Sequence, residues 1–322
     1  MTASAPLPSQ SNYIGRFAPS PSGKLHFGSL VAALASYLDA RAHNGEWLVR
    51  MEDLDPPREE SGAADSIIAS LEAHNLLWDQ SILYQSQRLE AYESVLEELE
   101  AHYCSIYPST YRCNCSRQRL IDLAGPYDRR CERTPPPLTT ACAIRLKTDQ
   151  LPPARQVQAE VFNDLFLGQQ QFSLPAMGDM IIRRKDGFFA YQLAVAVDDH
   201  YQNINHIIRG HDLIDSTSRQ RYILLMLNQI RHTAKTIPQY GHTPLVLGAD
   251  GGKLSKQSKA QPIDNSKAAS NLIAALQFLN HPPPLDDLEK RDCKTLLEWA
   301  IKAWQRTRVP IHSAVAPPLT DA

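Results

Sequence analysis

The chain has 322 residues and a formal net charge of −2, so it lacks a global basic field and would hold a nucleic acid only through local patches. Its composition, 43% hydrophobic and 21% charged, is typical of a globular protein with room for two or three domains. No apolar run reaches the roughly 18 residues of a membrane helix, and residues 1–10 lack the pattern of a secretory signal. We therefore expect a disordered N-terminus, no membrane partner, a cytoplasmic location, and six cysteines that are reduced or bind metal.

The first predicted elements form a strand–loop–helix unit. Residues 12–18 carry β-forming side chains, and Pro19 and Pro21 end the strand because proline lacks an N–H and fixes φ. Apolar residues at helical spacing predict a helix over residues 27–42. This helix begins just past the carboxyl end of the strand, where ligands bind in open α/β sheets, and its free N–H groups favour a phosphate.

Three residues at this helix start are candidate ligand contacts. His26 and Ser29 offer donors, and Gly28 lets a ligand approach the backbone closely. A Walker phosphate loop is excluded, because neither Gly23-Lys24 nor Gly252-Lys253 is followed by Ser or Thr. A histidine that only caps or packs the helix is the alternative for His26 alone.

Residues 46–51 predict the next strand and complete a β-α-β unit. The strand ends in Glu52, Asp53 and Asp55, which are either solvated charges or ligand contacts at a strand's carboxyl end. Helices predicted over residues 63–75 and 87–102 have apolar faces that would pack on the sheet.

Three cysteines follow at short range. Cys113, Cys115 and Cys131 could hold zinc if a fourth ligand completes a tetrahedron, although their spacing is not a usual zinc-finger pattern and idle thiols are the alternative. The arginines that surround the third cysteine would contact phosphates or belong to a solvated loop; they are Arg129, Arg130 and Arg133.

The second half of the chain predicts an antiparallel insertion over residues 142–174, followed by a return to the first domain. The strands expected there cover residues 180–184, 204–209 and 243–247, and the helices residues 189–200, 217–232, 266–279 and 292–304. Arg209 ends a buried strand and could clamp a carboxylate at two points. Tyr191 is either a site residue or a packed core aromatic.

Two stretches resemble the signatures of the class I aminoacyl-tRNA synthetases. Residues 26–29 are similar to the first signature, with Ser29 in place of its second histidine, and residues 16–23 and 52–58 resemble the glutamyl branch. Residues 253–257 are similar to the second signature, with Gln257 in place of the final serine. The resemblance implies an α/β fold: a Rossmann-type catalytic domain with a zinc-bearing insertion and a short helical C-terminal region.

The length of the chain after the second signature indicates which glutamyl-type synthetases it resembles. Only 65 residues (322 minus 257) follow the second signature, which leaves no room for a separate anticodon-binding domain. The chain from about residue 13 to residue 304 therefore resembles the glutamyl-queuosine tRNA(Asp) synthetases. The expected divisions are a disordered N-terminus (1–10), the first catalytic half (11–103), an insertion with the zinc site and a tRNA-acceptor-like subdomain (104–178), the second catalytic half (179–260) and a helical C-terminal region (261–322).

The same resemblance implies roles for individual residues. The catalytic set is His26, Lys253 and Lys256. The glutamate-binding set is Arg16, Ser20, Glu52, Tyr191 and Arg209. The ATP-binding set is Phe17, Ala18, Pro19, His26, Gly28, Ser29, Lys253, Leu254, Ser255, Lys256 and Gln257. The ligands of one structural zinc ion are Cys113, Cys115, Tyr127 and Cys131.

The implied activity has two steps. Glutamate is activated by ATP with Mg²⁺, without tRNA, and is then transferred to the queuosine base in the anticodon of tRNA(Asp) by a monomeric enzyme. Two alternatives remain: a truncated glutamyl-tRNA synthetase that charges a tRNA 3′ end, and a non-catalytic RNA- or zinc-binding relative.

Overall fold

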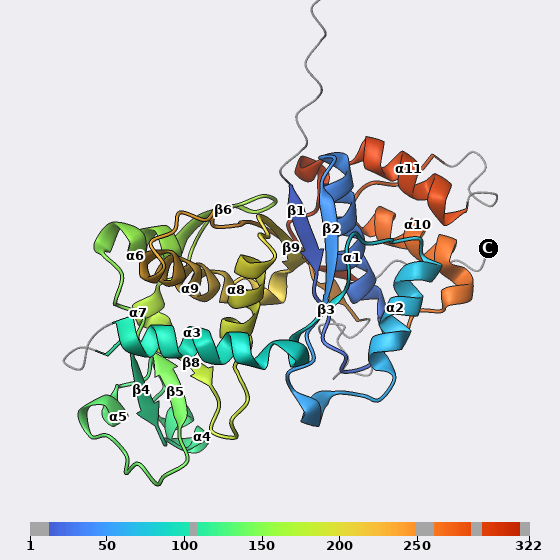
Figure 1. Ribbon diagram of the computed structural model, residues 1–322. Coiled ribbons are helices and arrows are strands. Elements are labelled where there is room, and N and C mark those ends of the chain that lie inside the picture. The colour runs from blue at the N-terminus through green and yellow to red at the C-terminus, as the bar shows by residue number, and fades with distance from the viewer. Residues whose placement is uncertain (1–12, 103–107, 249–260, 285–291, 316–322) are drawn as a thin grey trace, which may run out of the picture.

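The computed structural model describes residues 13–102, 108–248, 261–284 and 292–315 (Figure 1). Its centre is a sheet with the strand order β3-β2-β1-β9-β10-β6-β7, in which all neighbours are parallel except β6 and β7. The strands are β1 (Ile14–Phe17), β2 (Glu46–Met51), β3 (Leu83–Tyr84), β6 (Val161–Asp164), β7 (Gly168–Gln171), β9 (His206–Gly210) and β10 (Gln239–Thr243). The order reverses between β1 and β9, and this switch point is where a doubly wound sheet binds its ligand.

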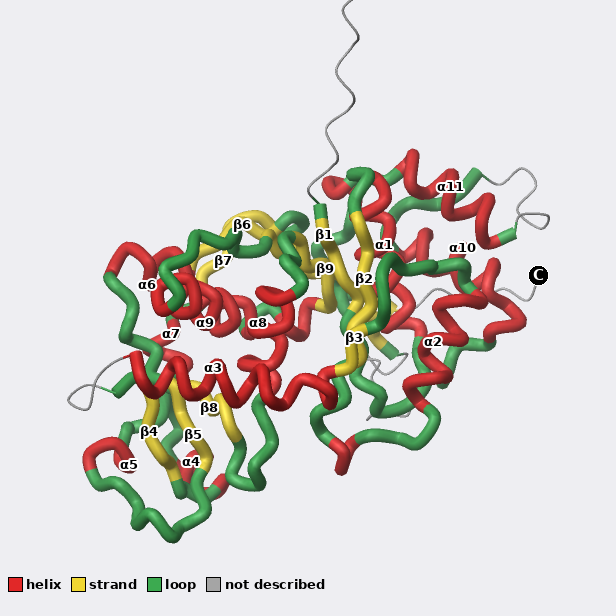
Figure 2. Tube along the Cα trace, viewed as in Figure 1, coloured by secondary structure: helices red, strands yellow, loops and turns green. Residues whose placement is uncertain are grey.

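Helices cover both faces of this sheet (Figures 1 and 2). One layer contains α1 (Phe27–Ala42), α2 (Ala63–Ala73), α10 (Ala268–Phe278) and α11 (Cys293–Ala303), and the other contains α3 (Leu89–His102), α8 (Tyr191–Tyr201) and α9 (Ser216–Ile230). The predicted helix over residues 27–42 is confirmed, because Leu30, Leu34 and Leu38 fall on one face and are fully buried. The predicted strand over residues 46–51 is confirmed as β2.

A buried carboxylate joins the C-terminal region to the first layer. Asp39 of α1 accepts hydrogen bonds from Tyr13 at 2.7 Å, from Trp304 at 2.9 Å, and from two nitrogens of Arg306 at 2.8 and 2.9 Å. Burial alone would raise the pKa of Asp39, but the hydrogen bonds and charge of the Arg306 guanidinium lower it below its usual value. The residues that follow α11 thus complete the core around the start of the sheet.

A smaller antiparallel sheet lies apart from the main one, at the lower left of Figure 1. Its order is β4-β5-β8, from β4 (Thr110–Cys113), β5 (Ala143–Leu146) and β8 (Met180–Arg183), with α4 (Arg117–Asp122) and α5 (Arg130–Arg133) beside it. The sequence had not predicted α4, α5, α6 (Pro153–Glu160) or α7 (Leu174–Met177). A short two-stranded sheet pairs β11 (Val246–Leu247) with β12 (Ala314–Val315).

Two strands lie in sheets other than those expected. Residues 161–164, expected inside the antiparallel insertion, pair antiparallel with β7 but also pair with β10, and so they extend the main sheet. Residues 180–183, expected in the second half of the catalytic domain, pair with β5. Side-chain alternation identifies a strand but does not choose its partner, which tertiary contacts decide. Among the described residues, no helix combines the length and the hydropathy needed to cross a membrane.

Candidate active site

A cavity of about 300 Å³ opens at the carboxyl ends of β1, β9 and β10. Its walls come from the loop after β1, the start of α1, the ends of β9 and β10, and β11. The residues expected to bind glutamate or ATP that line it are Arg16, Phe17, Ala18, Pro19, Ser20, His26, Gly28, Ser29 and Arg209. Thus nine predicted site residues share one cavity at the switch point of the sheet.

His26 is the N-cap residue of α1. Its Nδ1 accepts a hydrogen bond from the Ser29 backbone N–H at 3.3 Å, and its Nε2 lies 3.1 Å from the Ser29 hydroxyl oxygen. A Cβ at Gly28 would lie 3.2 Å from the His26 ring, so glycine leaves room for this ring over the helix start. His26 therefore caps α1, and the same ring lines the cavity beside the helix N-terminus.

A buried charge cluster supports the floor of the cavity. Asp199 of α8 binds Arg16 through both carboxylate oxygens, at 3.1 and 3.4 Å, and binds Arg50 at 2.8 Å. Arg50 also lies 3.5 Å from Glu52, and all four side chains are at least nine-tenths buried. Burial and the nearby Asp199 raise the pKa of Glu52 to about 7, although Arg50 and Arg16 pull it down.

Arg209 is held by neutral partners. Its Nε donates to His242 Nε2 at 3.1 Å, its Nη1 to Gln220 at 2.7 Å, and its Nη2 to Thr217 at 2.8 Å and to the Leu213 carbonyl at 3.1 Å. Four of its five N–H groups are therefore engaged within the described chain. Among the described residues, Arg16 uses two of its N–H groups, both with Asp199, and so has more donors left for a two-point contact with a carboxylate.

A neutral histidine fixes the orientation of Arg209. Burial and the charge of Arg209 lower the pKa of His242 to about 4, although its contact with Asp164 pulls the other way. The His242 ring therefore carries one proton, on the Nδ1 that lies 2.6 Å from Asp164, and leaves Nε2 to accept from Arg209. The β6 strand thereby contributes to the site through Asp164.

Two predicted glutamate-binding residues lie beside the cavity rather than in its lining. Tyr191 begins α8, and burial is the main cause of its raised pKa, with Arg209, Glu52 and Arg16 all close enough to influence it. Glu52 belongs to the charge cluster beneath Arg16. The structure thus brings all five predicted glutamate-binding residues to one region.

The predicted second signature falls outside the described residues: Lys253, Leu254, Ser255, Lys256 and Gln257 remain a sequence prediction. The described chain on either side of it borders the cavity. Val246 lines the cavity before this segment, and after it Pro262 forms a β-bridge with His26 while the Ile263 N–H donates to the Leu25 carbonyl at 3.0 Å.

Sequence reasoning missed the buried supports of the site. Asp199, His242 and Asp164 do not line the cavity, yet they hold the arginines that do. The available signal was the pair Asp198-Asp199 within an otherwise apolar helix, since a buried carboxylate requires a cationic or hydrogen-bonding partner.

A second cluster lies beside the antiparallel sheet. The sulfur atoms of Cys113, Cys115 and Cys131 all lie within 4.8 Å of one another, with 3.5 Å between those of Cys115 and Cys131. The Tyr127 hydroxyl lies 3.5 Å from Cys113 Sγ and 3.4 Å from Cys115 Sγ. A tetrahedral ion with metal–sulfur bonds of about 2.3 Å separates its sulfurs by about 3.8 Å, so the three cysteines can bind a metal ion.

The arginines near this cluster are engaged with the fold to different degrees. Arg129 forms ion pairs with Asp149 at 2.6 Å and Asp179 at 2.7 Å, and Arg133 donates to the Asp128 carbonyl at 2.8 Å. Arg130 is exposed. The structural role of Arg129 was not predicted.

The cysteine cluster leads to a first prediction. Replacing Cys131 with serine removes a thiolate ligand, so the purified protein should lose most of its metal, whereas wild type should hold about one ion per chain. Elemental analysis of the purified protein measures this content. The matched control is Cys142→Ser, because Cys142 lies outside the cluster and its loss should leave the metal in place. Equal metal content in both variants would contradict the assignment.

Comparison with known proteins agrees with this geometry. A family model described as "tRNA synthetases class I (E and Q), catalytic domain" matches residues 14–276. Proteins named Glutamyl-Q tRNA(Asp) synthetase from Serratia proteamaculans (strain 568) and Pseudomonas aeruginosa (strain LESB58) are 46% and 45% identical to the chain; the alignments cover 94% and 93% of it and 94% and 96% of those proteins. The crystal structure of a glutamate-tRNA synthetase from Elizabethkingia anophelis shares the fold, with a TM-score of 0.71 at 21% identity over 94% of this chain and 67% of that one. The chain therefore belongs to the class I tRNA synthetases of the E and Q type, within the family of the glutamyl-Q tRNA(Asp) synthetases.

Proposed function

We propose that the protein activates L-glutamate with ATP and transfers it to the queuosine base in the anticodon of tRNA(Asp). The observation that carries the proposal is the cavity at the switch point, where a helix N-terminus with His26 adjoins the buried Arg16 and Arg209. The start of the helix suits a phosphate, and the two arginines suit a carboxylate. A phosphate and a carboxylate are the two groups that react when glutamate is activated.

In the first step, an oxygen of the α-carboxylate of glutamate attacks the α-phosphorus of ATP. The bond from this phosphorus to the bridging oxygen of the β-phosphate breaks, and pyrophosphate leaves. Such a reaction needs positioning and charge stabilisation rather than a protein nucleophile. His26 and the start of α1 would stabilise the α-phosphate. Lys253 and Lys256 would stabilise the β- and γ-phosphates, which Mg²⁺ accompanies. The other residues of the ATP site would be Phe17, Ala18, Pro19, Gly28, Ser29, Leu254, Ser255 and Gln257.

The glutamate substrate would occupy the arginine side of the cavity. Arg16, with three N–H groups not engaged by the described chain, is the better two-point partner for one carboxylate, and Arg209 would add a single contact. Glu52 would attract the ammonium group, while Ser20 and Tyr191 would complete the pocket. In the second step, a hydroxyl of queuosine attacks the carbonyl carbon of the adenylate, and AMP leaves.

The cysteine cluster would hold one structural zinc ion, with Tyr127 as fourth ligand. The hydroxyl of Tyr127 lies within 3.5 Å of two of the sulfurs, which supports its assignment as the fourth ligand. Burial raises the pKa of Tyr127 in the metal-free chain, so its phenolate form would depend on the charge of the ion. This ion would stabilise the fold of the loop from Cys113 to Cys131.

The deciding experiment supplies labelled glutamate and ATP together with tRNA(Asp) that carries either queuosine or unmodified guanosine. Labelling of the queuosine form alone is the expected result. Equal labelling of both would indicate a truncated synthetase that charges the 3′ end. Failure to form glutamyl-adenylate at all would indicate a non-catalytic relative.

The pKa of Glu52 predicts a pH-dependent KM for glutamate. A carboxyl group with a pKa of about 7 is ionised above that pH and neutral below it, and only the ionised form attracts an ammonium group. The KM for glutamate in adenylate formation should therefore be about fivefold higher at about pH 6 than at about pH 7. Glu52→Gln should abolish this dependence, whereas Asp53→Asn, at the neighbouring residue, should retain it. A flat wild-type profile would refute the role of Glu52.

A further inference from the structure

A second cavity, of about 320 Å³, lies between the antiparallel sheet and the first turns of α8 and α9. Tyr127, Arg145 and Asp179 line it from the side of the metal cluster, and Gln192 and Arg219 line it from the two helices. Its volume is at the lower end of ligand pockets, which enclose roughly 300–1,000 Å³, so it suits one small ligand.

Arg145 is a deeply buried cation of this cavity, with 5% of its surface exposed. Its guanidinium lies 4.2 Å from the centre of the Tyr127 ring, and its Nη1 donates to the Asp179 carbonyl at 2.8 Å. Its Nε finds no hydrogen-bond partner among the described residues. A buried, charged donor without a partner is costly unless a ligand satisfies it.

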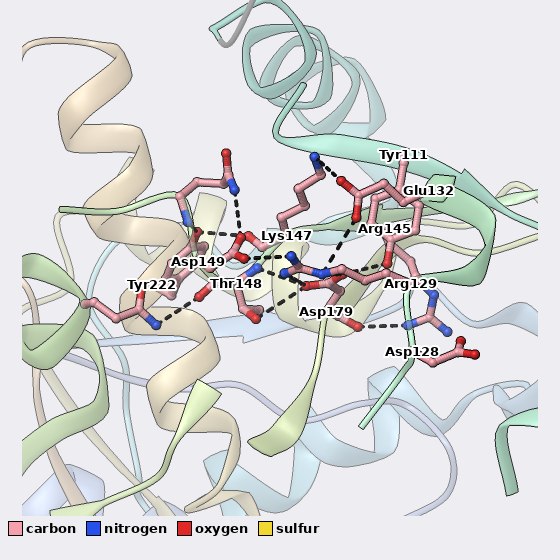
Figure 3. Close-up of polar contacts among 12 residues, drawn as sticks. Tyr111, Asp128, Arg129, Glu132, Arg145, Lys147, Thr148, Asp149, Asp179 and Tyr222 are labelled. Atoms are coloured by element: carbon pink, nitrogen blue, oxygen red, sulfur yellow. Dashed lines mark hydrogen bonds and ion pairs between the residues drawn. The ribbon is translucent and has the colours of Figure 1, made fainter. Parts of the chain in front are cut away.

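The carboxylate of Asp179 is engaged by residues other than Arg145 (Figure 3). The side-chain oxygens of Asp179 accept two hydrogen bonds from Arg129, at 2.7 and 2.8 Å, one from Tyr111 at 2.6 Å, and one from the Thr148 backbone N–H at 3.2 Å. Arg145 contacts only the backbone carbonyl of Asp179 and forms no ion pair within the described chain. No carboxylate of the described chain pairs with this guanidinium, so its positive charge is available to an anionic ligand in the cavity.

The opposite wall repeats this pattern. Arg219 of α9 donates through Nη2 to the Met177 carbonyl at 3.2 Å, and its Nε has no partner in the described residues. Gln192 of α8 donates to Ser216 at 3.0 Å, and its Oε1 likewise has none. Burial, together with the charge of Arg145, lowers the pKa of Arg219, so the two guanidinium groups are close enough to interact electrostatically. Two cationic side chains and an amide side chain thus line one cavity.

The remaining wall is apolar and includes Leu123, Met177 and Ile181. A ligand that satisfies every wall carries an anion, a planar group with hydrogen-bonding edges, and an apolar face. A nucleotide combines these three features, since guanidinium groups bind phosphates and amides bind base edges. Gln192 also directly follows Tyr191, so the cavity adjoins the region proposed to bind glutamate.

We propose that this second cavity binds one nucleotide of the RNA substrate, adjacent to the nucleoside that receives glutamate. This inference rests on the proposed function. Arg145 and Arg219 contact the phosphate, Gln192 reads the base edge, and the apolar wall packs against the base. The cavity thereby fixes the register of the single-stranded loop, because unstacked nucleotides are what proteins read in RNA.

The test uses the full chain and a fluorescent RNA hairpin with the anticodon stem-loop sequence of tRNA(Asp) and queuosine. Arg219→Met should weaken hairpin binding by about tenfold or more. The slope of log binding constant against log salt concentration should also become shallower by about 0.7, the value for one lost phosphate contact in a single strand. Pyrophosphate exchange, which reports adenylate formation, should stay within about twofold of wild type. Arg219→Lys should restore part of the binding.

The matched control is Arg221→Met. Arg221 lies on the same helix, is also half-buried with an unpartnered Nε among the described residues, and bonds the carbonyls of Gln158 and Val161 outside the cavity. This variant should bind the hairpin as wild type does. Equal binding by Arg219→Met and Arg221→Met, or no binding by wild type, would overturn the proposal.

Two further outcomes are informative. One distinguishes an RNA ligand from free phosphates, and the other distinguishes failure of this proposal from failure of the proposed function. If uridine 5′-monophosphate or inorganic phosphate displaces the hairpin at comparable concentrations, the cavity takes free phosphates, and the RNA assignment is overturned. If Arg219→Met loses hairpin binding while wild type transfers no glutamate, the nucleotide subsite stands and the proposed function fails.

Discussion

Replacing His26 with alanine is expected to slow glutamyl-adenylate formation by about 10²- to 10³-fold, the usual cost of removing a positioned donor from a developing negative charge. The ring lines the first cavity at the start of α1, where the helix N-terminus already favours a phosphate. Single-turnover formation of the adenylate is the measurement, since it isolates the chemical step from product release.

The capping role of His26 must be separated from its catalytic role. Loss of an N-cap costs about 1 kcal/mol of stability, and His26→Asn retains a good capping side chain while removing the imidazole. Both variants should therefore be slow, whereas only the alanine variant should be less stable. His43→Ala, at the C-terminal end of the same helix, is the matched control and should keep its activity. A rate within about threefold of wild type in His26→Asn would assign His26 to capping alone.

The second large effect is on stability. Asp199→Ala should lower the free energy of unfolding by about 3–5 kcal/mol, because it leaves Arg16 and Arg50 as buried charges without their shared carboxylate. Burial alone would raise the pKa of Asp199, but Arg16 and Arg50 lower it, so its contribution is present near neutral pH and is lost as pH falls through that lowered pKa. Urea unfolding at neutral pH measures the change.

The matched control for this prediction is a surface ion pair. Asp186 contacts Arg184 at 2.5 Å, but 45% of the Asp186 side chain is exposed, and such pairs contribute about 1 kcal/mol or less. Asp186→Ala should therefore unfold nearly as wild type does. A similar loss in both variants would show that Asp199 does not anchor the cluster.

The sequence alone predicted the parts of the fold that local pattern determines. The helix over residues 27–42 and the strand over residues 46–51 were predicted correctly, because apolar spacing and proline placement specify them. The sheets that residues 161–164 and 180–183 join were not predicted correctly, because two strands of similar alternating pattern can pair with either sheet.

The candidate site shows the same limit. His26, Arg16 and Arg209 were found because they lie near the carboxyl ends of strands or in a stretch that resembles a family signature, and they share one cavity. Asp199 and His242 were not found, because their roles depend on partners distant in the sequence. Tyr127 beside the cysteines was expected from family resemblance, since tyrosine has no characteristic ligand spacing.

The carboxylate of Asp39 has a consequence for the cooperativity of unfolding. It is fully buried, and its partners come from the start of the first strand and from the residues after the last helix, 265 and 267 positions away. If the C-terminal region opened first, Asp39 would lose Trp304 and Arg306 and remain charged inside an apolar layer. Partial opening of this layer is therefore unfavourable, and the Rossmann core and the C-terminal helices should melt as one thermodynamic unit.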